Sequence, residues 1–375
     1  MKKIKKILKL IFINVLVLFV LIVVANFLSI IIYKTYKSTN EYSDSRAKLP
    51  NYNEIEWTRH HFEELKELKA EYQSYIGWRM LKYSGKTINI DKDGIRNTPQ
   101  HNNVSQNSSS VVFLGGSTAW GVGADDKNTI PALISEMGEG RFKTLNYGEH
   151  SYRAFQGYLF LMSQINKGIK PDIVISYDGV NEKAGFEDNH KPTSHSRENQ
   201  LRVVMRGQDT NKAEEELMSF KNFFFGPLNN FISKFKTNKT LISSKENQTS
   251  ERRTELVARA LLDAWMASKS LAEENGALFF CVLQPVSVVG SPNLEYLKIN
   301  PERIKMYNQL YSKVLKLINT PDYNVLSDNF IDLRNVLDGQ DKYFIDFCHL
   351  SPNGNKVIAN NLFLEINNRI ENFNR

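Results

Sequence analysis

The sequence predicts an α/β fold, a three-layer α/β/α sandwich with a parallel sheet, preceded by one N-terminal transmembrane helix. Two observations carry this prediction. From residue 111 onward, short β-branched and aromatic runs alternate with longer stretches of helical periodicity, the pattern of a parallel sheet with crossover helices. Residues 10–33 contain no charged side chain, and a run of that length can span a hydrocarbon core of about 30 Å.

The net charge of +7 belongs to the membrane segment. Residues 1–37 contain lysines and no acid, and the rest of the chain is balanced. These lysines are Lys2, Lys3, Lys5, Lys6, Lys9, Lys34 and Lys37. A nucleic-acid-binding protein would carry a basic patch on its folded domain. The composition therefore predicts a membrane as partner and no nucleic acid.

The lysines before residue 10 also predict the orientation. By the positive-inside rule, the N-terminus lies in the cytoplasm and residues 38–375 lie outside it. A cleaved signal peptide is the alternative, because Val23, Val24 and Ala25 offer small residues for cleavage. The apolar run continues to Ile32, too far for an ordinary signal. We expect residues 1–37 to be an uncleaved anchor.

Residues 38–110 are expected to form a juxtamembrane connector with some structure of its own. Apolar side chains follow a helical spacing over residues 52–75. Residues 88–95 alternate and then turn at Asp93-Gly94, which predicts a hairpin. Residues 102–110 are polar and predict a loop.

Residues 111–375 are expected to form the α/β domain. Strands are predicted at residues 111–115, 144–147, 171–177, 278–283 and 323–326. Helices are predicted at residues 129–137, 153–167, 251–275, 301–318 and 355–373. Residues 186–250 break this rhythm with low periodicity and many polar residues, and long insertions of this kind are often lids or binding loops.

Chemistry is expected where the first strand ends. Gly115 and Gly116 deliver Ser117 at the carboxyl end of the strand, where open α/β folds bind ligands. Near the C-terminus, Asp346 and His349 stand three residues apart. A serine, an aspartate and a histidine in this chain order can form a catalytic triad.

Four short sequence motifs, called blocks here, lie between residue 111 and about residue 370. Together they resemble the motifs of the SGNH hydrolases, the GDSL-like family of serine esterases and acyl transferases. The matching residues are Ser117 in the first block, Gly148 in the second, Gly179 and Asn181 in the third, and Asp346 with His349 in the last. Two positions depart from the family: Gly116 replaces its usual aspartate, as in a Gly-Gly-Ser-Thr subgroup, and Glu182 replaces the second acid of the third block.

The resemblance implies a role for each of these residues, and the roles agree with general chemistry. Ser117 needs a base to become a nucleophile, and His349 supplies it. Asp346 orients the imidazole. The oxyanion formed on attack requires donors already in place. The backbone N–H groups of Ser117 and Gly148 and the side-chain amide of Asn181 are the candidates.

The remaining motifs predict no cofactor and no metal site. Histidines and cysteines lack metal-ligand spacing, and the glycines at positions 121 and 123 lack the rest of a dinucleotide fingerprint. Cys281 and Cys348 are expected to be small buried residues rather than a disulfide. His150 either borders the cleft or is a solvated loop residue.

The sequence therefore predicts a membrane-anchored, extracytoplasmic serine esterase acting on an acyl ester, such as an O-acyl group of an envelope glycan. One alternative is an O-acyltransferase that modifies an envelope polysaccharide through the same acyl-enzyme. That activity would need an acyl donor outside the cell, such as a membrane acyl carrier. The other alternative is a non-catalytic glycan-binding module, which the missing aspartate at position 116 suggests.

Overall fold

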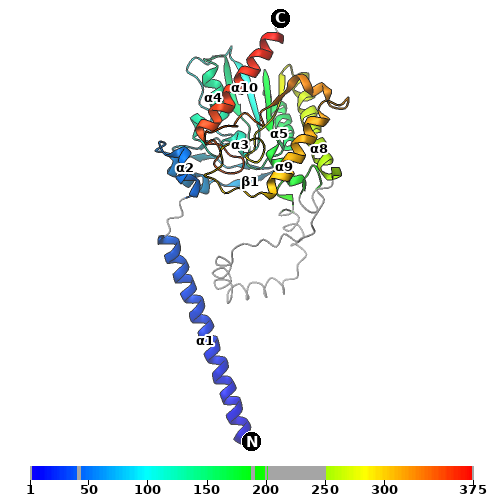
Figure 1. Cartoon of the computed structure of the whole chain (residues 1–375). Helices are drawn as coiled ribbons and strands as arrows, with labels where there is room; N and C mark the ends of the chain where they lie inside the picture. The colour runs from blue at the N-terminus through cyan, green and yellow to red at the C-terminus, as the bar shows by residue number, and fades with distance from the viewer. Residues whose placement is uncertain (1, 40–43, 187–190, 199–200, 202–250, 374–375) are drawn as a thin grey trace. The chain divides into compact units, whose positions relative to one another are not determined.

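The computed structural model describes residues 2–39, 44–186, 191–198, 201 and 251–373 (Figure 1). The N-terminal part is one helix, α1 (Lys2–Thr39). Within it, Ile4–Leu28 has a mean hydropathy of 3.1 and is long and apolar enough to cross a membrane. The segment predicted to cross the membrane is therefore helical, and its length and composition allow it to span a membrane.

The α/β unit is built on five parallel strands in the order β6-β5-β7-β8-β9. They are β5 (Ser109–Gly115), β6 (Phe142–Asn146), β7 (Ile173–Asp178), β8 (Leu278–Leu283) and β9 (Phe330–Asp332). In chain order this is 2-1-3-4-5, the flavodoxin-like arrangement. The order reverses between β5 and β7, and this switch point is where ligands of such sheets bind.

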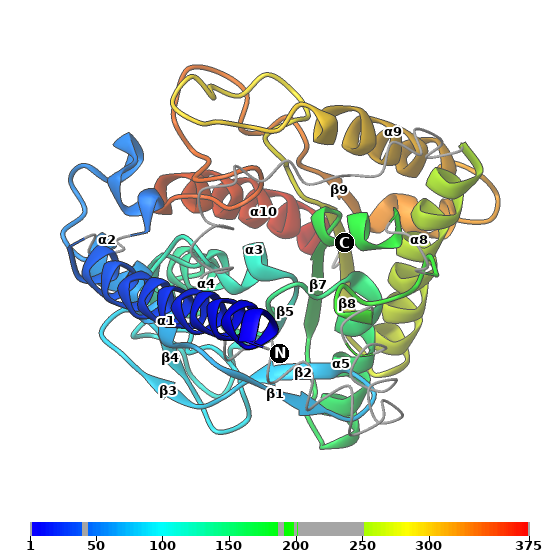
Figure 2. The same cartoon turned by 90° about the horizontal axis from the view of Figure 1, so that it is seen from below.

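Helices cover both faces of the sheet, because successive strand residues point to opposite sides (Figures 1 and 2). One face, with Val112 and Leu114, packs on three helices: α5 (Ala154–Asn166), α8 (Glu251–Glu274) and α9 (Glu302–Leu317). The other face, with Val111 and Phe113, packs on two: α4 (Ile130–Met137) and α10 (Pro352–Phe373). The predicted three-layer sandwich is confirmed.

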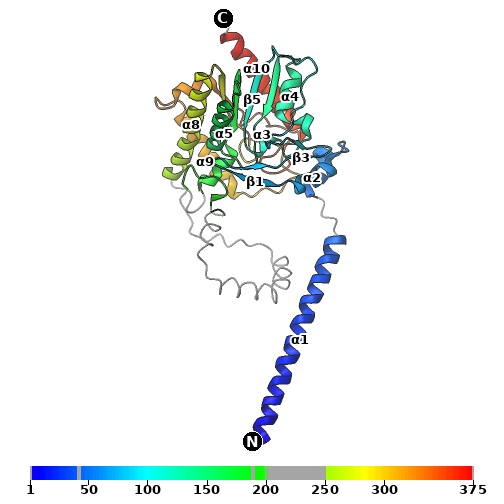
Figure 3. The ribbon, with the colours of Figure 1, turned by 180° about the vertical axis from the view of Figure 1, so that it is seen from behind.

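Residues 44–110 belong to the same compact unit as the sheet. Their elements are η1 (Ser45–Lys48), η2 (Pro50–Tyr52), α2 (Thr58–Glu67), β1 (Ala70–Gln73), β2 (Gly77–Met80), β3 (Tyr83–Ser84) and β4 (Asn89–Ile90). The fully buried Arg96 donates hydrogen bonds to the carbonyls of Trp120, Gly121 and Ala124. This segment therefore supports the chain that follows Ser117. The view from behind shows α2, β1 and β3 at the end of the sheet where α3 lies (Figure 3).

Two predicted elements differ in the structure. The helix expected over residues 52–75 spans only α2, and residues 70–80 form an antiparallel hairpin of β1 and β2. Tyr75 turns that hairpin with a φ of 69°, which a helix does not allow. The strand expected at residues 323–326 is a 3₁₀ helix, η6 (Asn324–Asn329), and the strand follows it as β9. Tyr323 and Leu326 are both buried, a spacing that fits one 3₁₀ turn.

The expected turn at Asp93-Gly94 is present, and Ile90 bridges to Arg96 across it. Three short helices complete the unit: α3 (Ser117–Trp120), η3 (Asp126–Asn128) and η4 (Val180–Phe186). Cys281 and Cys348 are buried and unpaired. Most of the insertion predicted at residues 186–250 lies outside the described residues.

Candidate active site

Ser117 stands where β5 meets the first turn of α3. Gly115 has a φ of 149°, and a Cβ there would lie 2.4 Å from the carbonyl oxygen of Tyr177 on the neighbouring strand. Only glycine fits such a close approach of two backbones. The turn thus places Ser117 at the carboxyl edge of the sheet, at the switch point between β5 and β7.

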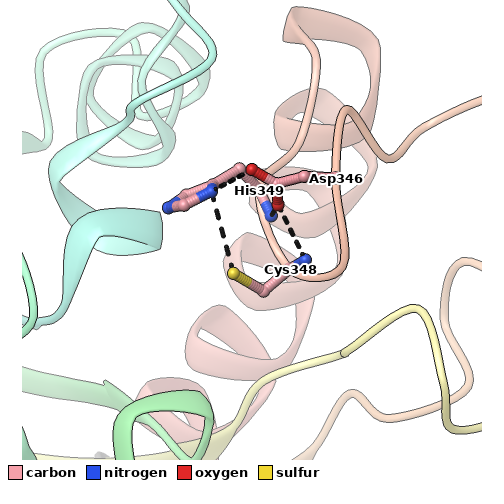
Figure 4. Close-up of side chains that lie close together, drawn as sticks. All are labelled: Asp346, Cys348 and His349. Carbon is pink, nitrogen blue, oxygen red and sulfur yellow. Dashed lines mark hydrogen bonds and ion pairs between the residues drawn. The ribbon is translucent and has the colours of Figure 1, made fainter. Parts of the chain in front are cut away.

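Ser117, His349 and Asp346 form a continuous hydrogen-bonded chain. The Ser117 Oγ lies 2.8 Å from His349 Nε2. On the other edge of the imidazole, Nδ1 lies 2.7 Å from Asp346 Oδ2, as Figure 4 shows for this pair. The structure brings together the three residues that the sequence predicted for the triad, although 232 positions separate Ser117 from His349.

Asp346 is held in its ionised form. Burial alone would raise its pKa, but the charge of His349 and several hydrogen bonds lower the pKa well below its usual range. The backbone N–H groups of Cys348 and His349 donate to Asp346 Oδ1 at 3.0 and 2.8 Å. The Arg46 guanidinium also lies 3.4 Å from Oδ2. A negative Asp346 fixes the tautomer of His349 in which Nε2 can accept the serine proton.

Asp346, Cys348 and His349 also place three possible metal ligands within 4.8 Å of one another (Figure 4). A metal would have to displace the 2.7 Å contact between His349 Nδ1 and Asp346. Burial raises the pKa of the Cys348 thiol well above its usual value, whereas metal ligation requires a thiolate. The donor set fits a proton relay better than a metal centre.

Asn181 lies directly beside the nucleophile turn. Its Nδ2 donates to the carbonyl of Tyr152 at 2.8 Å, and a Cβ on Gly116 would lie only 2.2 Å from that nitrogen. The absence of a side chain at position 116 therefore makes room for the Asn181 amide. One Nδ2 hydrogen goes to Tyr152, and no residue in the described part of the chain accepts the other.

The predicted donors differ in how they are engaged. The Gly148 N–H donates to Asn146 Oδ1 at 3.0 Å. No residue in the described part of the chain accepts a hydrogen bond from the Ser117 N–H. The structure thus offers the Ser117 N–H and one hydrogen of Asn181 for an oxyanion, while the Gly148 N–H already has a partner.

Glu182 and Arg153 form a buried support that the sequence analysis did not identify. Glu182 accepts from Arg153 Nε at 2.7 Å and from the Ala154 N–H at 3.1 Å, at the start of α5. Arg153 Nη1 also donates to the carbonyl of Ser194. Glu182 thus joins the Asn181 segment to the segment after Gly148. Its place directly after Asn181 was the one available signal.

His150 is not a solvated loop residue. Its ring packs edge-on against Trp120, with centroids 4.4 Å apart. Burial, with a smaller contribution from the charge of His349, lowers the pKa of His150 to about 3, so the ring is neutral.

Nearby, Ser196 Oγ donates to the carbonyl of Ser151 at 3.3 Å. The described start of the insertion therefore packs against the loop that follows Gly148.

No protein-family model and no curated protein matches this chain. Similar solved structures include a carbohydrate acetylesterase family member from Sinorhizobium meliloti (10% identity, TM-score 0.40, 70% of this chain and 99% of that chain). An acetyl xylan esterase is 14% identical, with a TM-score of 0.38 and coverage of 68% and 98%. A putative G-D-S-L lipolytic protein from Desulfitobacterium hafniense is 12% identical, with a TM-score of 0.36 and coverage of 69% and 99%.

Proposed function

We propose that this chain is a membrane-anchored serine esterase that works through an acyl-enzyme. The observation that carries the proposal is the unbroken path from Ser117 Oγ through His349 to the Asp346 carboxylate, with contacts of 2.8 and 2.7 Å. Ordinary serine is a weak nucleophile, and a base at hydrogen-bonding distance is what activates it. The third group, Asp346, holds that base in the productive tautomer.

In the first half of the proposed reaction, Ser117 Oγ attacks the ester carbonyl while its proton moves to His349 Nε2. The carbonyl oxygen becomes an oxyanion, which accepts hydrogen bonds from the Ser117 N–H and the Asn181 amide. When the tetrahedral intermediate collapses, His349 returns the proton to the departing alcohol. In the second half, His349 takes a proton from the water that attacks the acyl carbon. The bond between that carbon and Ser117 Oγ then breaks, the acid leaves, and His349 returns the proton to Ser117 Oγ.

We further propose that the ester is an O-acyl group of a cell-envelope glycan and that the α/β unit works outside the cytoplasm. The support is the apolar span Ile4–Leu28 with lysines on its N-terminal side. An anchored enzyme in that position meets the glycans of the envelope rather than cytoplasmic esters.

The first test is covalent labelling of the full-length chain in detergent by a fluorophosphonate probe. Wild type should be labelled at Ser117, and Ser117→Ala should not be labelled. Ser327→Ala is a control, since Ser327 lies in η6 and its hydroxyl donates to the Ile318 carbonyl rather than to a residue of the triad. A folded wild-type protein that resists the probe would contradict the esterase and leave a glycan-binding module.

A second test gives the direction of the reaction. The O-acyl content of envelope glycans is measured by mass spectrometry in cells with and without the gene. A hydrolase predicts more acyl groups when the gene is removed. Fewer acyl groups would instead show an acyltransferase, in which a sugar hydroxyl replaces water at the same acyl-enzyme.

A further inference from the structure

A cavity of about 510 Å³ lies beside the acid of the triad. Three parts of the chain form its wall: η1, the segment that leads into α9, and residues 345–347. Its polar and aromatic lining includes Arg46, Tyr296, Lys298, Arg303, Asp346 and Phe347. The reaction proposed above uses only Asp346 of this set.

The cavity carries an excess of positive charge. Arg46 is already paired with Asp44 at 2.9 Å and lies 3.4 Å from Asp346, the one lining carboxylate, which is itself bound to His349. The other two lining cations are Lys298 and Arg303. Lys298 and Arg303 contact no carboxylate in the part of the chain that the structure describes. The nearby Glu302 is exposed and accepts from Asn300 Nδ2 at 3.4 Å. Two lining cations are therefore left to bind an anion.

Two cationic side chains pack on the ring of Phe347, which lines the cavity. The Arg303 guanidinium lies 3.8 Å from the centroid of the Phe347 ring, and the Lys183 ammonium lies 4.8 Å from it. Lys183 follows Asn181 by two residues, and Arg303 is in the first turn of α9. The positive end of the helix dipole of α9 adds to the same potential. Cations from separate elements thus converge next to the triad.

We propose that this cavity is a subsite for an anionic group, a carboxylate or phosphate, on a molecule held next to Ser117. The proposal rests on the esterase function proposed above and adds the class of substrate that the same site would accept. Asp346 and Ser117 stand at opposite edges of one imidazole ring. An anion bound in the cavity therefore lies on the Asp346 side of the ring and an ester on the Ser117 side, so that the cavity would favour an acidic glycan over a neutral one.

The same chemistry has a second source, the headgroup of an anionic lipid. Arg46 lies on η1, which follows α1 closely in sequence. The test must therefore offer both a sugar carboxylate and a lipid phosphate. Neutral analogues of each provide the baseline.

The experiment measures binding to the full-length chain in detergent by calorimetry. The anionic probes are tri-galacturonate and glycerophosphoglycerol, and the neutral or zwitterionic counterparts are xylotriose and glycerophosphocholine. We expect an anionic probe to bind and its dissociation constant to rise by roughly 10–100-fold in a Lys298→Ala/Arg303→Ala variant, as loss of charged hydrogen bonds predicts. Binding should also weaken with added salt.

A charge-matched control lies on the same helix. Lys316 is in the last turn of α9, roughly 20 Å along the helix from Arg303 at 1.5 Å per residue, and Lys316→Ala should bind as wild type does. Arg303→Lys keeps the charge and should retain most of the affinity, which separates binding from folding. Equal effects of Lys316→Ala and the double variant would overturn the proposal.

The outcomes also separate the two sources and the two proposals. Binding of tri-galacturonate alone supports an acidic glycan, binding of glycerophosphoglycerol alone supports a lipid headgroup, and binding of neither overturns the subsite. Ser117→Ala should bind the same anion as wild type. If wild type binds the anion but resists fluorophosphonate, the subsite is supported and the esterase is contradicted. If wild type is labelled but binds no anion, the esterase is supported and the subsite is contradicted.

Discussion

The two sides of Ser117 are built differently. On the base side, side chains meet at 2.8 and 2.7 Å, and two backbone N–H groups fix the Asp346 carboxylate. On the oxyanion side, the Asn181 amide and the Ser117 N–H are available, but the Gly148 N–H is bound to Asn146. The predicted base side is hydrogen-bonded throughout, and on the predicted oxyanion side one of the expected donors already has a partner.

The difference shows what a sequence motif transfers and what it does not. A motif that names a side chain, such as Ser117 or His349, also names the atoms that react. A motif that names a glycine identifies only a backbone position, and the partner of its N–H depends on the neighbouring side chain. The following predictions test whether the base side and the oxyanion side contribute as unequally as the geometry indicates.

The largest effect is expected on the base side. His349→Ala should lower the turnover of 4-nitrophenyl acetate by roughly 10⁴–10⁶, and adding Ser117→Ala should reduce it little further, because the triad acts as a unit. The full-length chain in detergent is assayed, with circular dichroism as the check on folding. His101→Ala, in a loop, is the matched control and should keep its activity. A multiplicative loss in the double variant would show that the two residues work independently.

Asn181→Ala should have the second largest effect. Loss of one oxyanion donor predicts a decrease of roughly 10²–10³ in turnover, with the KM changed much less. Fluorophosphonate labelling should still occur, but slowly, since the base side is intact. Turnover equal to wild type would remove Asn181 from the oxyanion side and leave the Ser117 N–H as its one donor among the candidates.

Gly116→Ala moves the same amide without removing it. The new Cβ would lie 2.2 Å from Asn181 Nδ2, so the amide must shift, and a displacement near 1 Å can lower turnover by up to about 10². Gly157→Ala is the control, because a Cβ there meets only Leu114 at an ordinary 3.6 Å. If Gly116→Ala is fully active, Asn181 does not need its observed position.

Sequence alone could predict the base side because Ser117 directly follows a strand, and Asp346 and His349 stand three residues apart in a fixed chain order after it. It also predicted the alternation that builds the sheet and the start of α4 at Thr129. It could not predict the contact between Arg46 and Asp346, which lie 300 positions apart. The hairpin at residues 70–80 was missed because apolar residues at helical spacing also fit a strand over a few positions, and pairing with β2 decided between them.

Asn146→Ala tests whether the Gly148 N–H, which donates to Asn146, contributes to turnover. This change frees the Gly148 N–H and leaves the carbonyls of Ala119 and Trp120 without the Asn146 Nδ2, which lies 3.2 Å from each. We expect a loss of about 1–3 kcal/mol in the free energy of unfolding, measured by urea denaturation. Turnover should fall less than about tenfold, short of the loss of an oxyanion donor. A decrease as large as that of Asn181→Ala would place Gly148, oriented by Asn146, among the working donors.

The smallest effect on turnover is expected at Asp178, below the Asn181 segment, where the change should appear in stability instead. Asp178 ends β7, three residues before Asn181, and is buried. Burial raises the pKa of Asp178 to about 6, although hydrogen bonds from Ser176 and Trp265 act in the opposite direction. In the unfolded chain an aspartate titrates near pKa ~3.9.

Between these two pKa values the folded protein binds more protons than the unfolded chain, so stability should fall as the pH rises from about 4 to about 6 and then level off. The difference corresponds to a loss on the order of 2–3 kcal/mol. Asp178→Asn cannot titrate, and its amide oxygen can still accept from Trp265. The gap in unfolding free energy between the variant and wild type should therefore shift in favour of the variant across this pH range and stay constant above it. Comparing the two proteins cancels the other titrating groups, so parallel pH profiles would show that Asp178 is ionised in the folded protein throughout the range, and that the Asn181 segment rests on a charged rather than a protonated support.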